Sequence, residues 1–464
     1  MSVFATRRAQ LMKKLKRPVL LFAGGLISRN YPANWFAFRA DSNFLYFFAE
    51  PEAGSAAWLD PADGKVRLFL PERTVEDALW HGATESFAEA RARHGVDEVL
   101  AVEQLEEQVL KLAHGRTVDT LAVADAKATR RARAITGADA DFDDPSRVGS
   151  AELVDAIVSL RLKKGPEELA QMKATSEVTR QAHVDAIKHS RPGATEELIA
   201  GLVEGAFARH GCAPAYGTIC SVRGEVLHNH RQQYTLEAGD IMLLDAGAEA
   251  KSGYCSDVTR AWPVGGPFTP EGRAVYELVL AANLAAIAAV KPGVRYRDIH
   301  LLSARVIADG LVELGLLKGT GSARVESGAH ALFYPHGVGH QLGLDVHDFE
   351  TFGDRVLYPG RQRSPQFGTG FLRMDMDLAE GMTFTIEPGV YFVPAILRSQ
   401  KFRDQFKGEV DFEKAEQFLT CNKGKGFGGI RIEDDVYCSA TGADVLTKAI
   451  PKERAEIEAL AGTA

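Results

Sequence analysis

Residues 336–348 read HGVGHQLGLDVHD, and this stretch says most about the architecture of the chain. It holds three histidines, His336, His340 and His347. Gly337 and Gly339 disfavour a helix, so the stretch is not the HExxH helix of zinc proteases, in which Glu follows the first His. Glycines in a turn or strand let the backbone approach a site closely. A lone histidine would be a buried polar or surface residue, whereas three together predict a functional site.

Four apolar, strand-like runs around this stretch carry a carboxylate. A buried strand-end carboxylate is costly unless it is paired or bound to metal. Two glycines, Gly247 and Gly253, permit the first two strands to form a hairpin whose carboxylates repel unless a cation or proton lies between them. Taken singly, each acid would be a turn residue or an Asx cap. The predicted strands are Ile241–Asp245, Tyr254–Trp262, Thr383–Glu387 and Gly429–Glu433, and the carboxylates are Asp245, Asp257, Glu387 and Glu433.

The chemistry of this set suggests a metal. Four carboxylates with one imidazole suit hard or borderline divalent ions, with Mn²⁺ a better fit than a structural Zn²⁺. They suffice for two metals ~3.5–4 Å apart. Arg431 and Glu433 share one face of their strand, and the alternative is a surface ion pair worth under ~1 kcal/mol. We expect Asp434 and Asp435 to be solvated turn acids.

The elements around the carboxylates are mainly helices. Pro166 suits the first position of a helix, and Glu167 and Glu168 suit its first turn. Two stretches, 351–370 and 397–425, are predicted to be long irregular loops, which are usually functional. The predicted helices are Pro166–Ser190, Thr195–His210, Thr269–Val290 and Tyr296–Leu314.

The first third of the chain alternates short apolar strands with helical stretches, which predicts a small α/β domain. We therefore expect an α+β protein, with an N-terminal α/β domain over residues 1–160 and a catalytic domain over 161–464. The predicted elements are helices over Met1–Lys16 and Val102–Leu112 and strands over Val19–Ala23, Ala56–Leu59, Val66–Leu70 and Thr120–Ala124.

Composition limits the possible functions. The chain has 464 residues and a net charge of −8, so it lacks the basic balance that binding to nucleic acid requires. No apolar run approaches the length of a membrane span. Five scattered cysteines form no disulfide framework and no zinc ribbon, which favours the cytoplasm. Basic residues before the apolar run 18–27 imitate a secretion signal, but Gly24 and Gly25 interrupt the run and no cleavage site follows.

The ordered motifs resemble the pita-bread metallopeptidases, and within them the proline-specific branch of aminopeptidase P and prolidase. Besides HGVGHQLGLDVHD, the matching motifs are TIEPGVYF around Glu387 and GGIRIEDD around Glu433. The run FRADSNFLYFFAEPEAG is similar to the amino-terminal domain of that branch. The resemblance covers nearly the whole chain and implies a pita-bread (creatinase/aminopeptidase-like) catalytic domain.

The resemblance also implies a role for each matching residue. The metal ligands would be Asp245, Asp257, His340, Glu387 and Glu433. Glu387 would also shuttle the proton of the attacking water. The cofactor would be two divalent ions, most simply Mn²⁺, with Co²⁺, Zn²⁺ or Fe²⁺ as alternatives. The catalytic histidines would be His228, His336 and His347, and the substrate-side residues Arg373, Arg431 and Tyr391. His230 matches nothing and is interpreted as structural.

One spacing departs from the family. The two metal-binding aspartates usually lie eleven positions apart, whereas Asp245 and Asp257 lie twelve apart. The segment 249–256 carries the additional residue, and a bulge in the hairpin would absorb it. Without such an adjustment, Asp257 would point away from the site.

Two features favour prolidase, which cleaves Xaa-Pro dipeptides, over aminopeptidase P, which releases the N-terminal residue from longer Xaa-Pro peptides. Arg373 falls where prolidases place an arginine for the free carboxylate of proline, and arginine suits bidentate binding. The alternative is a surface loop arginine. The long connection between TIEPGVYF and GGIRIEDD is also prolidase-like.

Other readings remain open. Methionine aminopeptidases usually lack a large amino-terminal domain, and organophosphate hydrolysis is a plausible side activity. A creatinase-like metal-free enzyme or a non-catalytic binding protein on the same fold is disfavoured because all five ligand positions are filled. The expected partners are small peptides with proline in the second position, with no nucleic acid and no membrane. The resemblance further implies a homo-oligomer, a dimer or tetramer.

Overall fold

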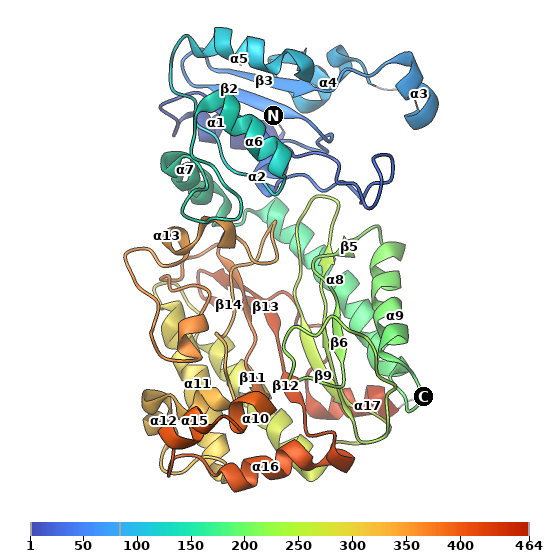
Figure 1. Ribbon diagram of the computed structural model, residues 1–464, viewed down its shortest axis with the longest axis vertical. Coiled ribbons are helices and arrows are strands. Elements are labelled where there is room, and N and C mark those ends of the chain that lie inside the picture. The colour runs from blue at the N-terminus through green and yellow to red at the C-terminus, as the bar shows by residue number, and fades with distance from the viewer. Residues whose placement is uncertain (1, 83–84, 463–464) are drawn as a thin grey trace. The chain divides into compact units, whose positions relative to one another are not determined.

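The computed structural model describes residues 2–82 and 85–462 (Figure 1). The chain divides into two compact units, residues 1–162 with 349–356, and residues 163–348 with 357–464. Both units mix helices and strands, which confirms the predicted α+β class. Among the described residues, no helix combines the length and apolar character needed to cross a bilayer.

The first unit is built on one sheet in the order β1-β2-β3-β4. Neighbouring strands are antiparallel except β3 and β4, which are parallel. Side chains such as Trp58 and Phe69 are fully buried in its core, against α5 and α6. The strands are β1 (Val19–Phe22), β2 (Ala56–Asp60), β3 (Lys65–Leu70) and β4 (Glu98–Ala101).

The helices of this unit follow local capping signals. Asp41 caps α2 and Asp125 caps α6, each by accepting backbone N–H groups of the first turn. The strand predicted over Thr120–Ala124 was wrong. Leu121 forms only an isolated bridge to Gly149, which is made by hydrogen bonds from Ser150 N–H to Thr120 O and from Ala122 N–H to Val148 O. The helices are α1 (Val3–Met12), α2 (Ser42–Phe47), α3 (Val75–His81), α4 (Phe87–His94), α5 (Leu105–Ala113), α6 (Ala126–Thr136) and α7 (Ala151–Arg161).

The four long helices predicted in the rest of the chain are confirmed. Pro166 begins α8, and the side chain of Glu168 caps Gly165 N–H at 2.9 Å. Helices α8 and α9 pack together beside β6, and α10 packs on α11 and on β10, β11 and β12 (Figure 1). Their bounds are α8 (Pro166–His189), α9 (Glu196–Arg209), α10 (Pro270–Ala288) and α11 (Tyr296–Glu313), followed by α12 (Gly321–Ser327), α13 (Asp354–Leu357) and α17 (Arg454–Gly462).

The second unit has several small sheets instead of one large sheet. Their orders are β6-β7-β9, β10-β13-β14, β11-β12 and β5-β8. The strands are β5 (Ala213–Pro214), β6 (Ile219–Ser221), β7 (Ile241–Asp245), β8 (Ala248–Glu249), β9 (Thr259–Pro263), β10 (Thr383–Ile386), β11 (Gly389–Tyr391), β12 (Gly429–Arg431), β13 (Asp434–Ser439) and β14 (Gly442–Val445).

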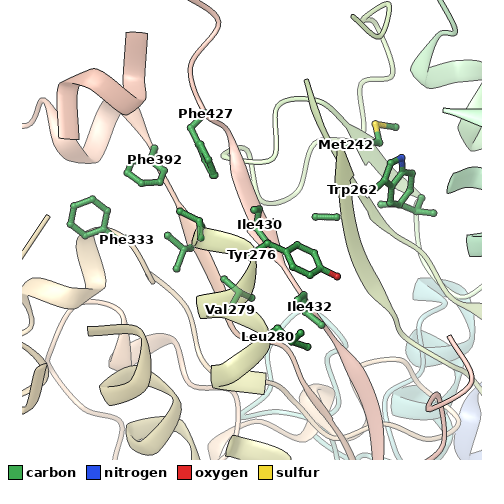
Figure 2. Packing of buried hydrophobic residues seen from close by; sticks show 14 of the residues in the cluster. Met242, Trp262, Tyr276, Val279, Leu280, Phe333, Phe392, Phe427, Ile430 and Ile432 are labelled. Atoms are coloured by element: carbon green, nitrogen blue, oxygen red, sulfur yellow. The ribbon is translucent and has the colours of Figure 1, made fainter. Parts of the chain in front are cut away.

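One hydrophobic cluster joins these sheets to the helices. Ile430 and Ile432 pack near Tyr276 and Leu280 of α10, and Met242 lies beside its cross-strand partner Trp262 (Figure 2). Side chains alternate across a strand. Arg431 and Glu433 therefore face away from this cluster, as does Asp245, which alternates with Leu244 of the cluster.

The two segments predicted as long loops differ. Segment 351–370 contains only short helical turns besides α13. Segment 397–425 was wrongly predicted as irregular. It holds α15 (Gln400–Gln405) and α16 (Phe412–Thr420), after α14 (Pro394–Leu397). Asp411 caps α16, and Ala415, Phe418 and Leu419 form its buried face, a spacing typical of an amphipathic helix.

Candidate metal centre and active site

The β7–β9 hairpin brings Asp245 and Asp257 to one face. Asp245 pairs with Thr259 in the antiparallel register. Asp257 lies two residues before Thr259 and therefore points to the same side of the sheet. The hydroxyl of Tyr216 donates to Asp245 Oδ1 at 2.5 Å and also contacts Asp257 Oδ1.

The additional residue between the two aspartates sits at the tip of the hairpin. Backbone hydrogen bonds join Ala246 to Val258 and Ala250 to Tyr254, so the register is unchanged along the hairpin. The tip is a short turn in which Gly253 has a φ of +88°, as in a three-residue hairpin loop. The adjustment expected within 249–256 is therefore confined to the turn, and Asp257 still faces Asp245.

The hairpin ladder is interrupted just before Asp257, where Ala248 N–H donates to Thr179 Oγ1 and Ser256 Oγ and not to a backbone carbonyl. The N–H of Asp257 points away from β7 and donates to the carboxylate of Asp435 at 3.1 and 3.2 Å. The prediction of a continuous strand over Tyr254–Trp262 was therefore wrong, and regular pairing begins at Thr259. The prediction that Asp434 and Asp435 are solvated was also wrong. Both side chains are buried, and each accepts hydrogen bonds inside the fold, Asp434 from Arg260 and Asp435 from Asp257 N–H.

The glycines of the histidine stretch are required by close backbone contacts. A Cβ atom at Gly339 would lie 2.2 Å from Thr385 O, and one at Gly337 would lie 2.7 Å from Leu372 Cα. This contact lets His340 N–H donate to Thr385 Oγ1 at 3.2 Å. It also lets Glu387 N–H donate to Val338 O at 2.8 Å. The stretch is therefore fixed along β10, directly beside Glu387.

His340 presents one ring nitrogen to the carboxylates. Its Nδ1 lies 2.9 Å from the carbonyl of Gln341, so Nδ1 donates to that carbonyl and Nε2 faces the carboxylates. Nε2 lies 3.3 Å from Asp257 Oδ2 and 3.7 Å from Glu387 Oε1. An imidazole whose Nδ1 is held by a backbone carbonyl is the usual arrangement of a histidine ligand, which binds its metal through Nε2.

The five residues predicted as ligands converge, with His347 beside them. Their ligand atoms fall into three overlapping groups, each within 4.8 Å: Asp257, His340 and His347; His340, Glu387 and Glu433; Asp245, Asp257 and Glu433. Burial, together with neighbouring carboxylates, raises the pKa of Asp257, Glu387 and Glu433. Buried carboxylates at this density require protons or cations, so the donor set fits a pair of divalent ions.

A hydrogen-bonded chain borders this cluster. Tyr391 hydroxyl lies 2.9 Å from His336 Nε2 and 3.0 Å from Arg431 Nη1, and Arg431 also contacts Asp245. Arg431 Nε donates to Thr259 Oγ1 at 2.9 Å, and that hydroxyl donates to Glu433 at 2.6 Å. Burial and the nearby Arg431 lower the pKa of His336 to about 3, which keeps the ring neutral. Arg431 and Glu433 are thus no surface pair, because only 4% and 2% of their surfaces are exposed.

The carboxylate cluster and the neighbouring histidines surround a cavity of about 520 Å³. Its lining includes the five predicted ligands and His228, His336, His347, Arg373 and Arg431. Tyr391 lies behind the wall, in contact with His336 and Arg431. His230, which was interpreted as structural, lines the same cavity. Burial and then Arg431 lower the pKa of His228.

Sequence reasoning missed three residues of this site. Tyr216 lies 29 positions before Asp245, and nothing near it indicates a role. Thr259 could have been found, because it lies two positions after Asp257 and shares its strand face. Asp435 was assigned to the surface, because a third consecutive acid gives no sign of burial.

Comparisons with known proteins agree with this geometry. Residues 170–440 match the family model "Metallopeptidase family M24", and residues 4–121 match "Aminopeptidase P, N-terminal domain". The chain is 31% identical to an Xaa-Pro aminopeptidase of Escherichia coli (strain K12) over 474 residues, which covers 98% of this chain and 97% of that protein. It is also 31% identical to an Xaa-Pro dipeptidase of Homo sapiens over 480 residues, covering 99% and 93%.

Solved structures give the same picture. The structure of Pseudomonas aeruginosa aminopeptidase PepP is similar with a TM-score of 0.81 at 31% identity, covering 99% of this chain and 97% of that one. Zinc-substituted E. coli aminopeptidase P in complex with product is similar with a TM-score of 0.81 at 29% identity, covering 100% and 99%. The likeness therefore extends over both units.

Proposed function

Because the chain belongs to metallopeptidase family M24, we propose that it hydrolyses the peptide bond preceding proline, with Xaa-Pro dipeptides as its preferred substrates. Full-length relatives named Xaa-Pro aminopeptidase and Xaa-Pro dipeptidase support the choice of bond. The observation that carries the preference for dipeptides is the position of Arg373, which lines the same cavity as the carboxylate cluster.

The metal centre is the first part of this proposal. Asp245, Asp257, His340, Glu387 and Glu433 would hold two divalent cations. Oxygen-rich ligation with one imidazole favours Mn²⁺, with Co²⁺, Zn²⁺ and Fe²⁺ as alternatives. Ions bound there would activate a water molecule and polarise the scissile carbonyl.

Glu387 is suited to hold the proton taken from the attacking water. Its carboxyl lies 3.7 Å from His340 Nε2 and lines the cavity together with the other predicted ligands. A carboxylate there would lie within hydrogen-bond reach of a water held by the ions, which is the geometry that a general base requires. Glu387 would then return the proton to the proline nitrogen, which must be protonated to leave.

The histidines and Tyr391 would orient the substrate. His336 Nδ1 donates to Gly337 O at 2.7 Å. Its Nε2 can therefore accept a hydrogen bond, either from the hydroxyl of Tyr391 or from a group of the substrate. His347 lies with its ring centroid 4.0 Å from that of His340, beside the cluster. His228 and His347 line the same cavity, and an N–H group of either ring would stabilise the charge that develops on the scissile carbonyl oxygen.

Arg373 would bind the free carboxylate of a dipeptide. A guanidinium can donate two parallel hydrogen bonds to a carboxylate, which gives both affinity and geometric selectivity. In an Xaa-Pro-Yaa tripeptide the proline carboxylate is replaced by an amide, so this pairing is lost. An arginine in this cavity therefore selects for substrates that end at proline.

The test compares Xaa-Pro dipeptides with Xaa-Pro-Yaa tripeptides, with Mn²⁺ present, for the unmodified protein and Arg373→Ala. We expect dipeptides to be preferred and Arg373→Ala to lose dipeptide cleavage selectively, mainly through KM. Arg361→Ala is the matched control, because Arg361 lies in the same segment but pairs with Asp377. Unchanged dipeptide cleavage by Arg373→Ala would refute the role of Arg373.

Aminopeptidase P activity is the second candidate. It is favoured by the similarity to two solved aminopeptidases over nearly the full chain. A preference for tripeptides in the same assay would establish it instead of dipeptidase activity. The homo-oligomeric state and the cytoplasmic location stay predictions from the sequence.

A further inference from the structure

Asn283 joins the two segments that carry Glu387 and Glu433. It lies on α10 and is 0% exposed. Its Nδ2 donates to Ile386 O at 3.0 Å and to Ile432 O at 3.2 Å. These are the carbonyl groups immediately before the two glutamates. One side-chain amide therefore spans the backbone at both glutamates.

These two segments run antiparallel in one register. The register of β10 with β13 continues into that of β11 with β12, so Glu387 and Glu433 lie opposite each other between the two pairs of strands. A backbone hydrogen bond of 3.2 Å from Ile432 N–H to Pro388 O also links them. The ladder is interrupted at the two glutamates, because Pro388 has no N–H to donate to Ile432 O. Asn283 donates to that carbonyl instead.

A buried ionic network fixes the orientation of Asn283. Lys452 Nζ donates to Asn283 Oδ1 at 2.8 Å and to Asp434 Oδ2 at 2.7 Å. Arg260 pairs with Asp434 Oδ1 at 2.9 Å and donates to Glu433 O at 2.6 Å. Because Lys452 occupies the amide oxygen, the Nδ2 group must face the two carbonyls. The network thus holds the backbone on both sides of Glu433.

We propose that Asn283 is a positioning residue that sets the spacing of Glu387 and Glu433, and that Lys452 locks it in place. This inference rests on the proposed metal centre and goes beyond its ligands. Asn283 contacts no reacting atom in this scheme. It acts through the backbone. Its loss would let the two glutamates shift relative to each other and would lower the affinity for a metal ion bound by both of them.

The effect should follow the general behaviour of groups that support metal ligands. Changing such a group typically costs about 10–100-fold in metal affinity or activity. Asn283→Leu keeps nearly the same volume but removes both donors. We expect one of two Mn²⁺ sites to weaken by about this factor, with kcat falling at limiting Mn²⁺ and KM for a dipeptide little changed.

The experiment titrates metal-free protein with Mn²⁺ by calorimetry, with bound metal counted after dialysis. Asn283→Leu is compared with Lys452→Met, Lys452→Arg and Lys448→Met. Lys452→Met removes the ammonium group that orients the amide and that also pairs with Asp434, at a position whose side chain is 16% exposed. It decides the question if Asn283→Leu does not fold. Lys448→Met is the matched control, because Lys448 is exposed in the same segment.

Weaker Mn²⁺ binding in Asn283→Leu or Lys452→Met, recovery in Lys452→Arg and no change in Lys448→Met would support the proposal. Unchanged Mn²⁺ affinity in the folded variants would overturn it, even if their metal-free thermal stability falls, because a purely structural role predicts only that fall. The titration uses no peptide. Failure of the Xaa-Pro assignment would therefore appear in the peptide assay alone, and failure of the Asn283 assignment in the titration alone.

Discussion

The proposed role of Glu387 in proton transfer can be tested by a single substitution. Glu387→Gln keeps the size of the side chain but cannot accept or return a proton. We expect kcat to fall by about 10²–10⁴-fold at saturating Mn²⁺, the usual contribution of a general acid–base group. Circular dichroism should show an unchanged fold. Near-normal turnover at full metal loading would remove the proton-transfer role.

At this scale the sequence predicted chemical type better than environment. Asp245, Glu387 and Glu433 were found because a carboxylate that ends an apolar run is costly without a partner. Asp435 was missed because burial of an acid depends on what lies across the fold, here Asp257 N–H. Tyr216 was missed for the same reason, since its hydroxyl meets Asp245 only after the chain has folded.

The β7–β9 hairpin depends on the absence of a side chain at Gly247. A Cβ atom there would lie 1.8 Å from Ser256 O, next to Asp257. Gly247→Ala should therefore force the strands apart, destabilise the fold by about 1–3 kcal/mol or more, and weaken Mn²⁺ binding. Thermal unfolding and Mn²⁺ titration would measure both effects.

Gly201→Ala is the matched control for this hairpin prediction. Gly201 lies in α9, and a Cβ atom there would meet nothing within 4 Å. Alanine at an open helical position should stabilise the protein by about 0.5–1 kcal/mol. If Gly247→Ala left the melting temperature and Mn²⁺ binding as Gly201→Ala does, the close contact at Ser256 would not contribute to stability or to the metal site.

Elements were predictable where local signals agreed with the fold. Helix α8 follows from Pro166 and its first-turn glutamates. Helix α16 was not predicted, because its short buried face was overlooked among polar residues. The strand expected through Asp257 was wrong because the hydroxyls of Thr179 and Ser256 replace the neighbouring strand as hydrogen-bond partners of Ala248 N–H. No periodicity in the sequence reports that exchange.

The whole molecule should show linkage between metal and protons. Burial raises the pKa of Asp257 and Glu387 to about 7 in the metal-free protein, above the value of about 4 of such groups in an unfolded chain. A raised folded-state pKa contributes stability below the unfolded value, and this contribution is lost as pH rises through about 7. Bound metal ions replace these protons, so the metal-loaded protein does not lose this stability as the pH rises.

We therefore expect the gain in melting temperature on adding Mn²⁺ to widen between pH 5.5 and pH 8. Taking the difference between metal-loaded and metal-free protein cancels the titration of groups far from the site. Scanning calorimetry in the presence of Mn²⁺ or of a chelator would measure it. A gain that is constant or shrinks with rising pH would mean that these carboxyls do not exchange protons for metal.

We propose that five side chains from separate segments bind two divalent ions and thereby create a peptidase. Its most direct test is a titration of chelator-treated protein with Mn²⁺, in which bound metal per chain and Xaa-Pro dipeptide hydrolysis are measured in the same samples. We expect two ions per chain and hydrolysis that appears as the ions bind. Hydrolysis at full rate in the chelated protein, or no stoichiometric binding, would contradict it.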